Sequence, residues 1–148
     1  MINISRAFEW DMGHRVTNHA SLCKNPHGHH YRMLVSVTGV IDEREGTTTQ
    51  GMVVDFGTLK QLIDEAIVDM YDHSFVYWSK DDVMRRFADE NPDFRMYGLS
   101  FVPTAERLVE FFAEEIKRVL QKKLPALRLS GVELFETPKS SATWSVEA

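Results

Sequence analysis

Two segments of this chain alternate between the two sides of an extended strand, and they constrain its fold more than any other feature. In residues 2–14, every second residue lies on one side, and that side carries large apolar residues and ends at His14. Residues 27–37 repeat the pattern, with His27 and His29 at its start. A period of two is typical of a β-strand with one buried face. We therefore expect two strands whose apolar faces both carry histidine at one end.

Two later segments predict amphipathic helices. The apolar residues within 59–70 and within 108–120 recur at three- and four-residue spacing, which is typical of a helix with one buried face. Asp55 and Thr104 stand just ahead of these segments, where they are expected to act as N-caps. Pro125 is expected to end the second helix.

The order of the remaining segments indicates the fold class. Strands at about 127–137 and 141–147 complete the order β-β-α-α-β-β, which predicts an α+β fold with an antiparallel sheet and both helices on one face. Residues 78–102 read as an insertion, with a short helix expected at 80–90. A length of 148 residues predicts one domain, residues 1–148, with enough chain to bury a core.

A cluster of histidines surrounds the only cysteine. Five of the six histidines fall between positions 14 and 30, and Cys23 is followed after three residues by His27-Gly28-His29. Two histidines one residue apart on a strand point to the same side, about 7 Å apart. This separation suits two ligands of one Zn²⁺ at about 2.0–2.1 Å, and His14 would be a third, leaving the fourth position open as in catalytic zinc sites. A polar, solvated loop is the alternative, because a single His-x-His pair is a weak pattern.

Two further positions carry candidate side chains. Asp72-His73 follows the first predicted helix, where the pair is either part of a proton-transfer set with Cys23 or an ordinary helix end. Glu136 shares a strand side with Val132 and Leu134, so it lies at the end of an apolar row. If it is buried, this carboxylate needs a partner, either the N–C–N donor edge of a pterin or guanine ring or a basic side chain. The remaining alternative is simple exposure at the end of the strand.

Composition excludes several classes of protein. A net charge of −5 and a pI near 5.7 argue against nucleic acid as a partner, because phosphate backbones require a basic face. No apolar run reaches the about 18 residues of a membrane span, and the first residues lack the layout of a signal peptide. One cysteine forms no internal disulfide, which favours a reducing, cytoplasmic location.

Six blocks of residues occur in order along nearly the whole chain. They are Phe8-x5-His14, Cys23-x3-His27-Gly28-His29, Gly-Met-Val-Val-Asp-Phe at 51–56, Asp72-His73, Pro103-Thr104-x-Glu106 and Glu136-Thr137. Together they resemble the 6-pyruvoyltetrahydropterin synthase family, whose bacterial branch includes the 6-carboxytetrahydropterin synthases of queuosine biosynthesis. The resemblance implies three kinds of site residue: zinc ligands, a catalytic cysteine with its proton relay, and pterin contacts. His14, His27 and His29 match the zinc ligands. Cys23 matches the catalytic cysteine, and Asp72 and His73 match its proton relay. Glu136, Thr104 and Glu106 match the residues that contact the pterin.

The resemblance also implies an assembly and a reaction. It implies the T-fold, in a homo-oligomer built on trimers, including hexamers, with active sites at subunit interfaces. The short spacing from Cys23 to His27 is similar to the bacterial enzymes, so we expect a lyase that converts 7,8-dihydroneopterin triphosphate to 6-carboxy-5,6,7,8-tetrahydropterin. Two alternatives stay open: a pyruvoyl-forming enzyme that eliminates triphosphate, and a non-catalytic zinc-dependent module that binds a pterin or purine.

Two features depart from the family pattern. Arg107 stands where asparagine is common, and an arginine there would alter contacts to the ring or phosphates. The insertion carries Arg85, Arg86 and Arg95, which are expected to form a solvated face rather than a triphosphate site.

Overall fold

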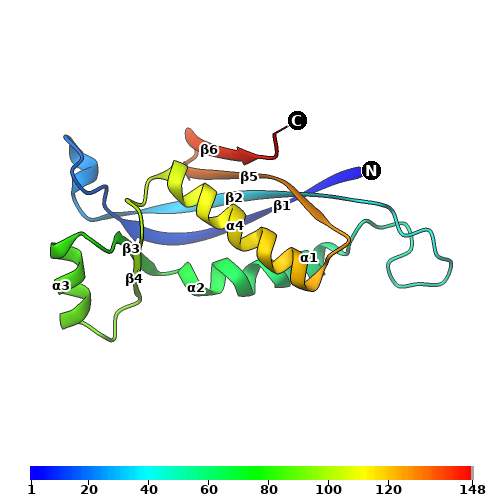
Figure 1. The fold of residues 1–148 in the computed structure, drawn as a ribbon, viewed down its shortest axis with the longest axis horizontal. Coiled ribbons are helices and arrows are strands. Elements are labelled where there is room, and N and C mark those ends of the chain that lie inside the picture. Colours follow the sequence, from blue (N-terminus) through cyan, green and yellow to red (C-terminus); the bar gives the residue numbers. More distant parts are fainter. Residues whose placement is uncertain (148) are drawn as a thin grey trace.

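The structure is a computed structural model that describes residues 1–147 as a six-stranded sheet with helices on one face (Figure 1). The strands are β1 (Ile2–His14), β2 (His27–Gly39), β3 (Ser74–Trp78), β4 (Met96–Leu99), β5 (Arg128–Thr137) and β6 (Ser140–Ser145). The helices are α1 (Phe56–Ile63), α2 (Asp69–Tyr71), α3 (Asp82–Glu90) and α4 (Ala105–Lys123), with a 3-10 turn at Leu22–Lys24 and a π-helical turn at Asp64–Val68. The predicted α+β class is confirmed.

The sheet has the strand order β4-β3-β1-β2-β5-β6. β1 and β2 pair antiparallel along their full length, so that Ile2 lies opposite Gly39 and His14 opposite His27. The pairs β2–β5 and β5–β6 are also antiparallel, as predicted. β3 runs parallel to β1, and β4 parallel to β3, so the prediction of a wholly antiparallel sheet is wrong at this edge. Helical crossovers precede both strands, and such crossovers allow parallel neighbours.

The predicted helices are present with their predicted caps. The Asp55 side chain accepts a hydrogen bond from the Thr58 N–H at 3.0 Å, and Thr104 Oγ1 accepts one from the Arg107 N–H at 3.3 Å. The first helical run contains the π-helical turn, which inserts an extra residue and rotates the residues after it. As a consequence Tyr71 is buried and Met70 is exposed, so the predicted buried position of Met70 is wrong.

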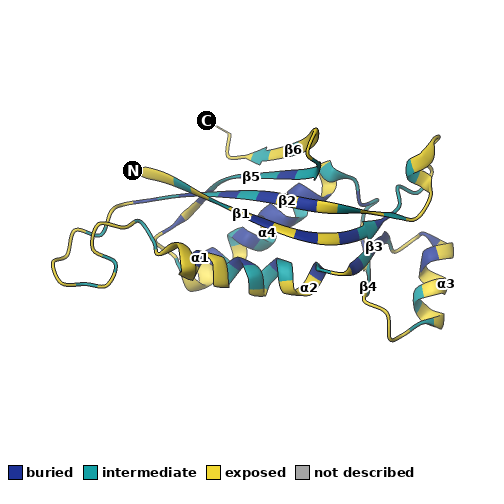
Figure 2. Ribbon diagram, turned by 180° about the vertical axis from the view of Figure 1, so that it is seen from behind, coloured by how far each residue is buried: buried dark blue, intermediate teal, exposed yellow. Residues whose placement is uncertain are grey.

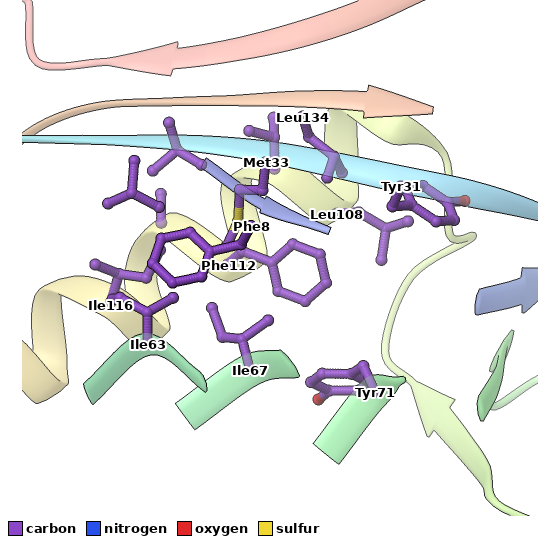
Figure 3. Packing of buried hydrophobic residues seen from close by; sticks show 14 of the residues in the cluster. Phe8, Tyr31, Met33, Ile63, Ile67, Tyr71, Leu108, Phe112, Ile116 and Leu134 are labelled. Atoms are coloured by element: carbon purple, nitrogen blue, oxygen red, sulfur yellow. The ribbon is translucent and has the colours of Figure 1, made fainter. Parts of the chain in front are cut away.

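The core lies between the sheet and the helices. Phe8, Met33 and Leu134 project from β1, β2 and β5 toward Ile67 and Phe112 of the helical layer (Figure 3). Fully burying a side chain of this size contributes roughly 1.5–3 kcal/mol, so these contacts fix the helices on one face of the sheet. The exposed and buried residues alternate along β1 and β2, as their sequence pattern predicts (Figure 2).

The two ends of the sheet differ. The loop of residues 15–26, which carries Cys23, lies at the same end as α3, whereas the loop between β2 and α1 extends from the other end (Figure 1). His14, at the end of the buried row of β1, therefore lies where the core meets the Cys23 loop. Within residues 1–147, no helix combines the length and apolar character needed to cross a membrane.

Candidate metal centre and active site

The three predicted metal ligands converge at the paired ends of β1 and β2. His14 lies directly opposite His27 across the strand pair, and His29 is two residues further along β2 on the same side. The ring centroids are 4.7 Å apart for His14 and His27, 4.9 Å for His27 and His29, and 5.3 Å for His14 and His29. One nitrogen of each ring lies within 4.8 Å of the others, so the three side chains form a possible metal-binding group.

Hydrogen bonds set the tautomers of two of these rings. His14 Nδ1 lies 2.7 Å from the carbonyl oxygen of Pro103, and His27 Nδ1 lies 2.6 Å from that of Asn25. A carbonyl oxygen only accepts, so each Nδ1 carries the proton and donates it, which leaves each Nε2 with a free lone pair. Metal-bound histidines commonly make such a bond from their other ring nitrogen.

The buried Nε2 atoms of His14 and His29 make no hydrogen bond to any described residue. Burial lowers the pKa of His14 and of His29, and neighbouring histidines lower both further. The Pro103 carbonyl opposes this shift at His14, and the Glu136 carboxylate opposes it at both residues. Neutral imidazoles with buried, unpartnered nitrogens are the form in which histidine binds a metal, so these residues fit a Zn²⁺ ion.

Glu136 connects this centre to a cavity. Its carboxylate lies 3.5 Å from His29 Nε2 and 3.9 Å from His14 Nε2. The same side chain lines a cavity of about 260 Å³ together with Cys23, Thr104 and Glu106. Four side chains predicted from three separate parts of the sequence therefore meet beside the three histidines.

The predicted relay residues lie elsewhere. Asp72 Oδ1 is 2.9 Å from His73 Nδ1 and accepts a hydrogen bond from the Asp11 N–H at 3.1 Å. His73 has a left-handed backbone conformation (φ 59°), is exposed, and lines a depression with Asp11 and His30 on the sheet face opposite His14. Asp72 and His73 do not line the cavity that contains Cys23, so one described chain does not bring the relay together.

Burial would by itself raise the pKa of Asp72. Hydrogen bonds from the Asp11 N–H and from His73 outweigh this effect and hold the pKa of the carboxyl below its ordinary value. Asp72 is therefore ionised near neutral pH and is able to orient the His73 ring through Nδ1. Asp11, Asp72 and His73 also form a second group of close potential ligands, on the exposed side of the sheet.

Three of the four arginines named in the sequence analysis, Arg85, Arg95 and Arg107, have partners in the structure. Arg107 pairs with Glu110 at 2.7 Å, and its guanidinium lies 5.3 Å from the centroid of Phe101. Arg85 pairs with acidic residues of α3, and Arg95 donates to carbonyl oxygens at the end of α2. These contacts agree with a solvated face.

Sequence reasoning missed the groups that hold the site in place. The carbonyls of Pro103 and Asn25 orient two histidines, and backbone groups of this kind leave no signal in residue type. A partly buried ion pair between Arg15 and Asp81 was also missed, because its members are 66 positions apart. The adjacency of Arg15 to His14 was the only available signal.

Comparisons with known proteins agree over nearly the whole chain. A family model described as 6-pyruvoyl tetrahydropterin synthase matches residues 3–147. A 6-carboxy-5,6,7,8-tetrahydropterin synthase of Haemophilus influenzae is 32% identical over 95% of this chain and 96% of its own length. One of Rickettsia bellii is 30% identical over 93% and 96%, respectively.

Two solved structures share the fold. An uncharacterized protein from Wolinella succinogenes superposes with a TM-score of 0.79 at 23% identity, over 99% of this chain and 98% of that chain. The Caenorhabditis elegans 6-pyruvoyl tetrahydropterin synthase superposes with a TM-score of 0.67 at 24% identity, over 99% and 96%. The shared architecture is consistent with the predicted T-fold.

Proposed function

The chain belongs to the 6-pyruvoyl tetrahydropterin synthase family, and from this premise we propose that it converts 7,8-dihydroneopterin triphosphate and one water to 6-carboxy-5,6,7,8-tetrahydropterin, with release of acetaldehyde and triphosphate. Relatives named for the carboxy product match this chain at 27–32% identity, which favours that product. The same proposal places the protein in the cytoplasm and its product in queuosine biosynthesis.

One observation carries the proposal. Three histidines converge with unpartnered Nε2 atoms on two of them, beside a cavity lined by Cys23 and Glu136. A metal site beside a thiol and a carboxylate provides the three functions that the reaction needs: charge stabilisation, proton transfer and anchoring of the ring. His14, His27 and His29 would hold a zinc ion, which would supply Lewis-acid stabilisation of negative charge on the substrate side-chain oxygens.

The remaining roles belong to side chains. Cys23, as a thiolate, takes a proton from a carbon of the substrate side chain and returns it in a later step. Glu136 accepts hydrogen bonds from the N–C–N edge of the pterin, and Thr104 and Glu106 make further contacts to the ring. Anchoring the ring in this way places the side chain of the substrate between the histidines and the thiol.

A second copy of the chain would complete the relay. Asp72 and His73 lie on the sheet face opposite the three histidines, so they would serve the Cys23 of a neighbouring subunit. In this proposal Asp72 orients His73, and His73 exchanges the proton with the thiol. We propose a homo-oligomer built on trimers, with hexamers included, in which each active site lies at a subunit interface.

Incubation with dihydroneopterin triphosphate tests the proposal. Purified protein is incubated with this substrate before and after removal of metal by a chelator, and the products are identified by mass spectrometry. We expect 6-carboxytetrahydropterin, acetaldehyde and triphosphate from the metal-loaded protein only. A pyruvoyl product would make the protein a 6-pyruvoyltetrahydropterin synthase. Binding of the pterin without release of triphosphate would make it a zinc-dependent binding module.

A further inference from the structure

Asp81 is a buried carboxylate outside the catalytic set. It is the N-cap of α3 and is only 2% exposed. Arg15 donates to it twice, from Nε at 2.6 Å and from Nη2 at 2.9 Å, and Thr17 Oγ1 donates at 2.8 Å. The cap itself needs only the hydrogen bond from the Met84 N–H at 3.3 Å. The other three hydrogen bonds all come from the first residues of the loop that carries Cys23.

The same residues hold the far end of this loop. Arg15 Nη1 donates to the carbonyl oxygen of Lys24 at 3.5 Å, and the Val16 N–H donates to the carbonyl oxygen of Cys23 at 2.8 Å. Residues 15–17 therefore link α3 on one side to residues 23–24 on the other. Arg15 directly follows His14, so the link begins beside the histidine centre.

The charges make this link rigid. Burial would raise the pKa of Asp81, but hydrogen bonds from Arg15, Thr17 and the Met84 N–H hold the pKa below its ordinary value. An ionised carboxylate with a two-point contact to a guanidinium has a fixed geometry, because the planar fork matches both oxygens. Loss of Arg15 would leave the buried Asp81 carboxylate without a counter-charge, which is strongly unfavourable.

We propose that Asp81 is a positioning residue for Cys23: through Arg15 and Thr17 it fixes the loop that holds the thiol in the cavity that Glu136 also lines. This assigns the start of α3, within the insertion, the role of a clamp on the catalytic loop. The claim that the clamp affects turnover rests on the proposed function, whereas the claim that it orders the loop does not.

Asp81→Asn provides the test, with Asp82→Asn as the matched control. Asparagine retains N-cap ability, but its amide group cannot serve as a carboxylate for the Arg15 fork. Asp82 is the neighbouring residue of the same helix, is exposed and, among residues 1–147, pairs only with Arg85, so the control makes the same chemical change without touching the loop.

Limited proteolysis with trypsin measures directly how well ordered the loop is. Lys24 is exposed, and its carbonyl oxygen accepts the hydrogen bond from Arg15. We expect cleavage after Lys24, followed by mass spectrometry of fragments 1–24 and 25–148, to be at least about ten-fold faster in Asp81→Asn than in wild type or Asp82→Asn. Equal cleavage rates in the two variants would overturn the proposal, whatever substrate the enzyme uses.

Steady-state kinetics test whether Asp81 positions the thiol. Asp81→Asn should lower kcat about ten-fold with KM changed less than about two-fold and the metal content unchanged, because a displaced thiol affects the chemical step rather than binding. Faster cleavage with wild-type kcat would overturn the positioning role. Lack of turnover in wild type would instead contradict the proposed function and leave the cleavage result valid.

A double variant guards against a general folding defect. In Arg15→Gln/Asp81→Asn neither charge remains, so no unpaired charge is buried. If the two residues act through one contact, the double variant should lose no more kcat than the more severe single variant, whereas independent effects would multiply. Multiplied effects would overturn the linkage, and melting temperatures of all variants report any loss of folding.

Discussion

The two groups of candidate catalytic residues lie on opposite faces of the same sheet and have opposite character. On the face covered by the helices, the His14 ring is buried and the His29 ring is half-buried, their Nε2 atoms make no hydrogen bond to any residue of 1–147, and burial lowers the pKa of both. On the exposed face, His73 and His30 each pair with a carboxylate, and hydrogen bonds to Asp11 and Glu9 raise the pKa of His30.

This difference separates two kinds of chemistry. Unpartnered, neutral nitrogens are available to a metal, whereas exposed, carboxylate-paired histidines are suited to carrying a proton. The chain therefore presents a binding group and a relay group that do not face each other. Under the proposed function, a single copy holds the parts of the active site without assembling them. The largest expected effects therefore come from variants that remove one group at a time.

Cys23→Ala and His73→Ala test the groups one at a time. Each variant should lose roughly 10²–10⁴-fold in kcat, because each lacks a group that transfers the proton. Both should still bind one zinc per chain, since neither residue belongs to the histidine centre. The measurements are steady-state kinetics and metal analysis of the purified variants. Full activity of Cys23→Ala would remove the thiol from the mechanism.

Mixing these two variants tests whether the groups come from different chains. If each site takes Cys23 from one subunit and His73 from another, random reassembly of equal amounts should restore about a quarter of the sites. The two proteins are dissociated, mixed and reassembled, and kcat per site is compared with each variant treated alone. No recovery, with mixed oligomers demonstrated by native mass spectrometry, would place both residues of a working site in one chain.

The sequence predicted the first group more completely than the second. His14, His27 and His29 lie on regular strands, and alternation alone determines which way each side chain points. Asp72 and His73 lie at a helix end, and the positive φ of His73 follows from no local pattern. Residue types therefore identified the pair as candidates but not the face on which it lies.

The parallel edge of the sheet was hidden for a related reason. β3 and β4 are short, and their neighbours in the sheet are set by the crossovers through α1, α2 and α3 rather than by their own residues. The π-helical turn likewise has no marker in the apolar spacing, and it shifted the buried residue from Met70 to Tyr71. Local periodicity predicted the elements, whereas long-range contacts determined these details.

Glu136→Gln tests which group the carboxylate serves. If Glu136 anchors the pterin ring, the amide should raise KM by about 10- to 100-fold, since a hydrogen bond to a charged group contributes roughly 1.5–3 kcal/mol. Zinc content should stay at one per chain. Loss of zinc with KM unchanged would instead make Glu136 a metal ligand. Its carboxylate lies 3.5 Å from His29 Nε2 and 3.9 Å from His14 Nε2, so this is the main alternative role.

The smallest expected effect is on the pH dependence of the free energy of unfolding, measured on metal-free protein. The histidines of the two groups should contribute to this dependence with opposite signs. The pKa of His14 and of His29 is lowered on folding, so the unfolded chain binds more protons than the folded chain below pH about 6.5. The free energy of unfolding should therefore fall as the pH falls through about 6.5. His30, whose pKa is raised, contributes stability that is present below about 6.5 and is lost as the pH rises through its folded-state pKa.

Urea unfolding of wild type and His30→Gln between pH 5.5 and 7.5 with a chelator present separates these contributions. The variant should lose stability more steeply on acidification, by less than about 1 kcal/mol, because the His30 ion pairs are exposed and screened by solvent. A variant that instead becomes relatively more stable at low pH would show that His30 is not held in its charged form by Asp11. Folding would then not shift the pKa values of the histidines in opposite directions on the two faces of the sheet.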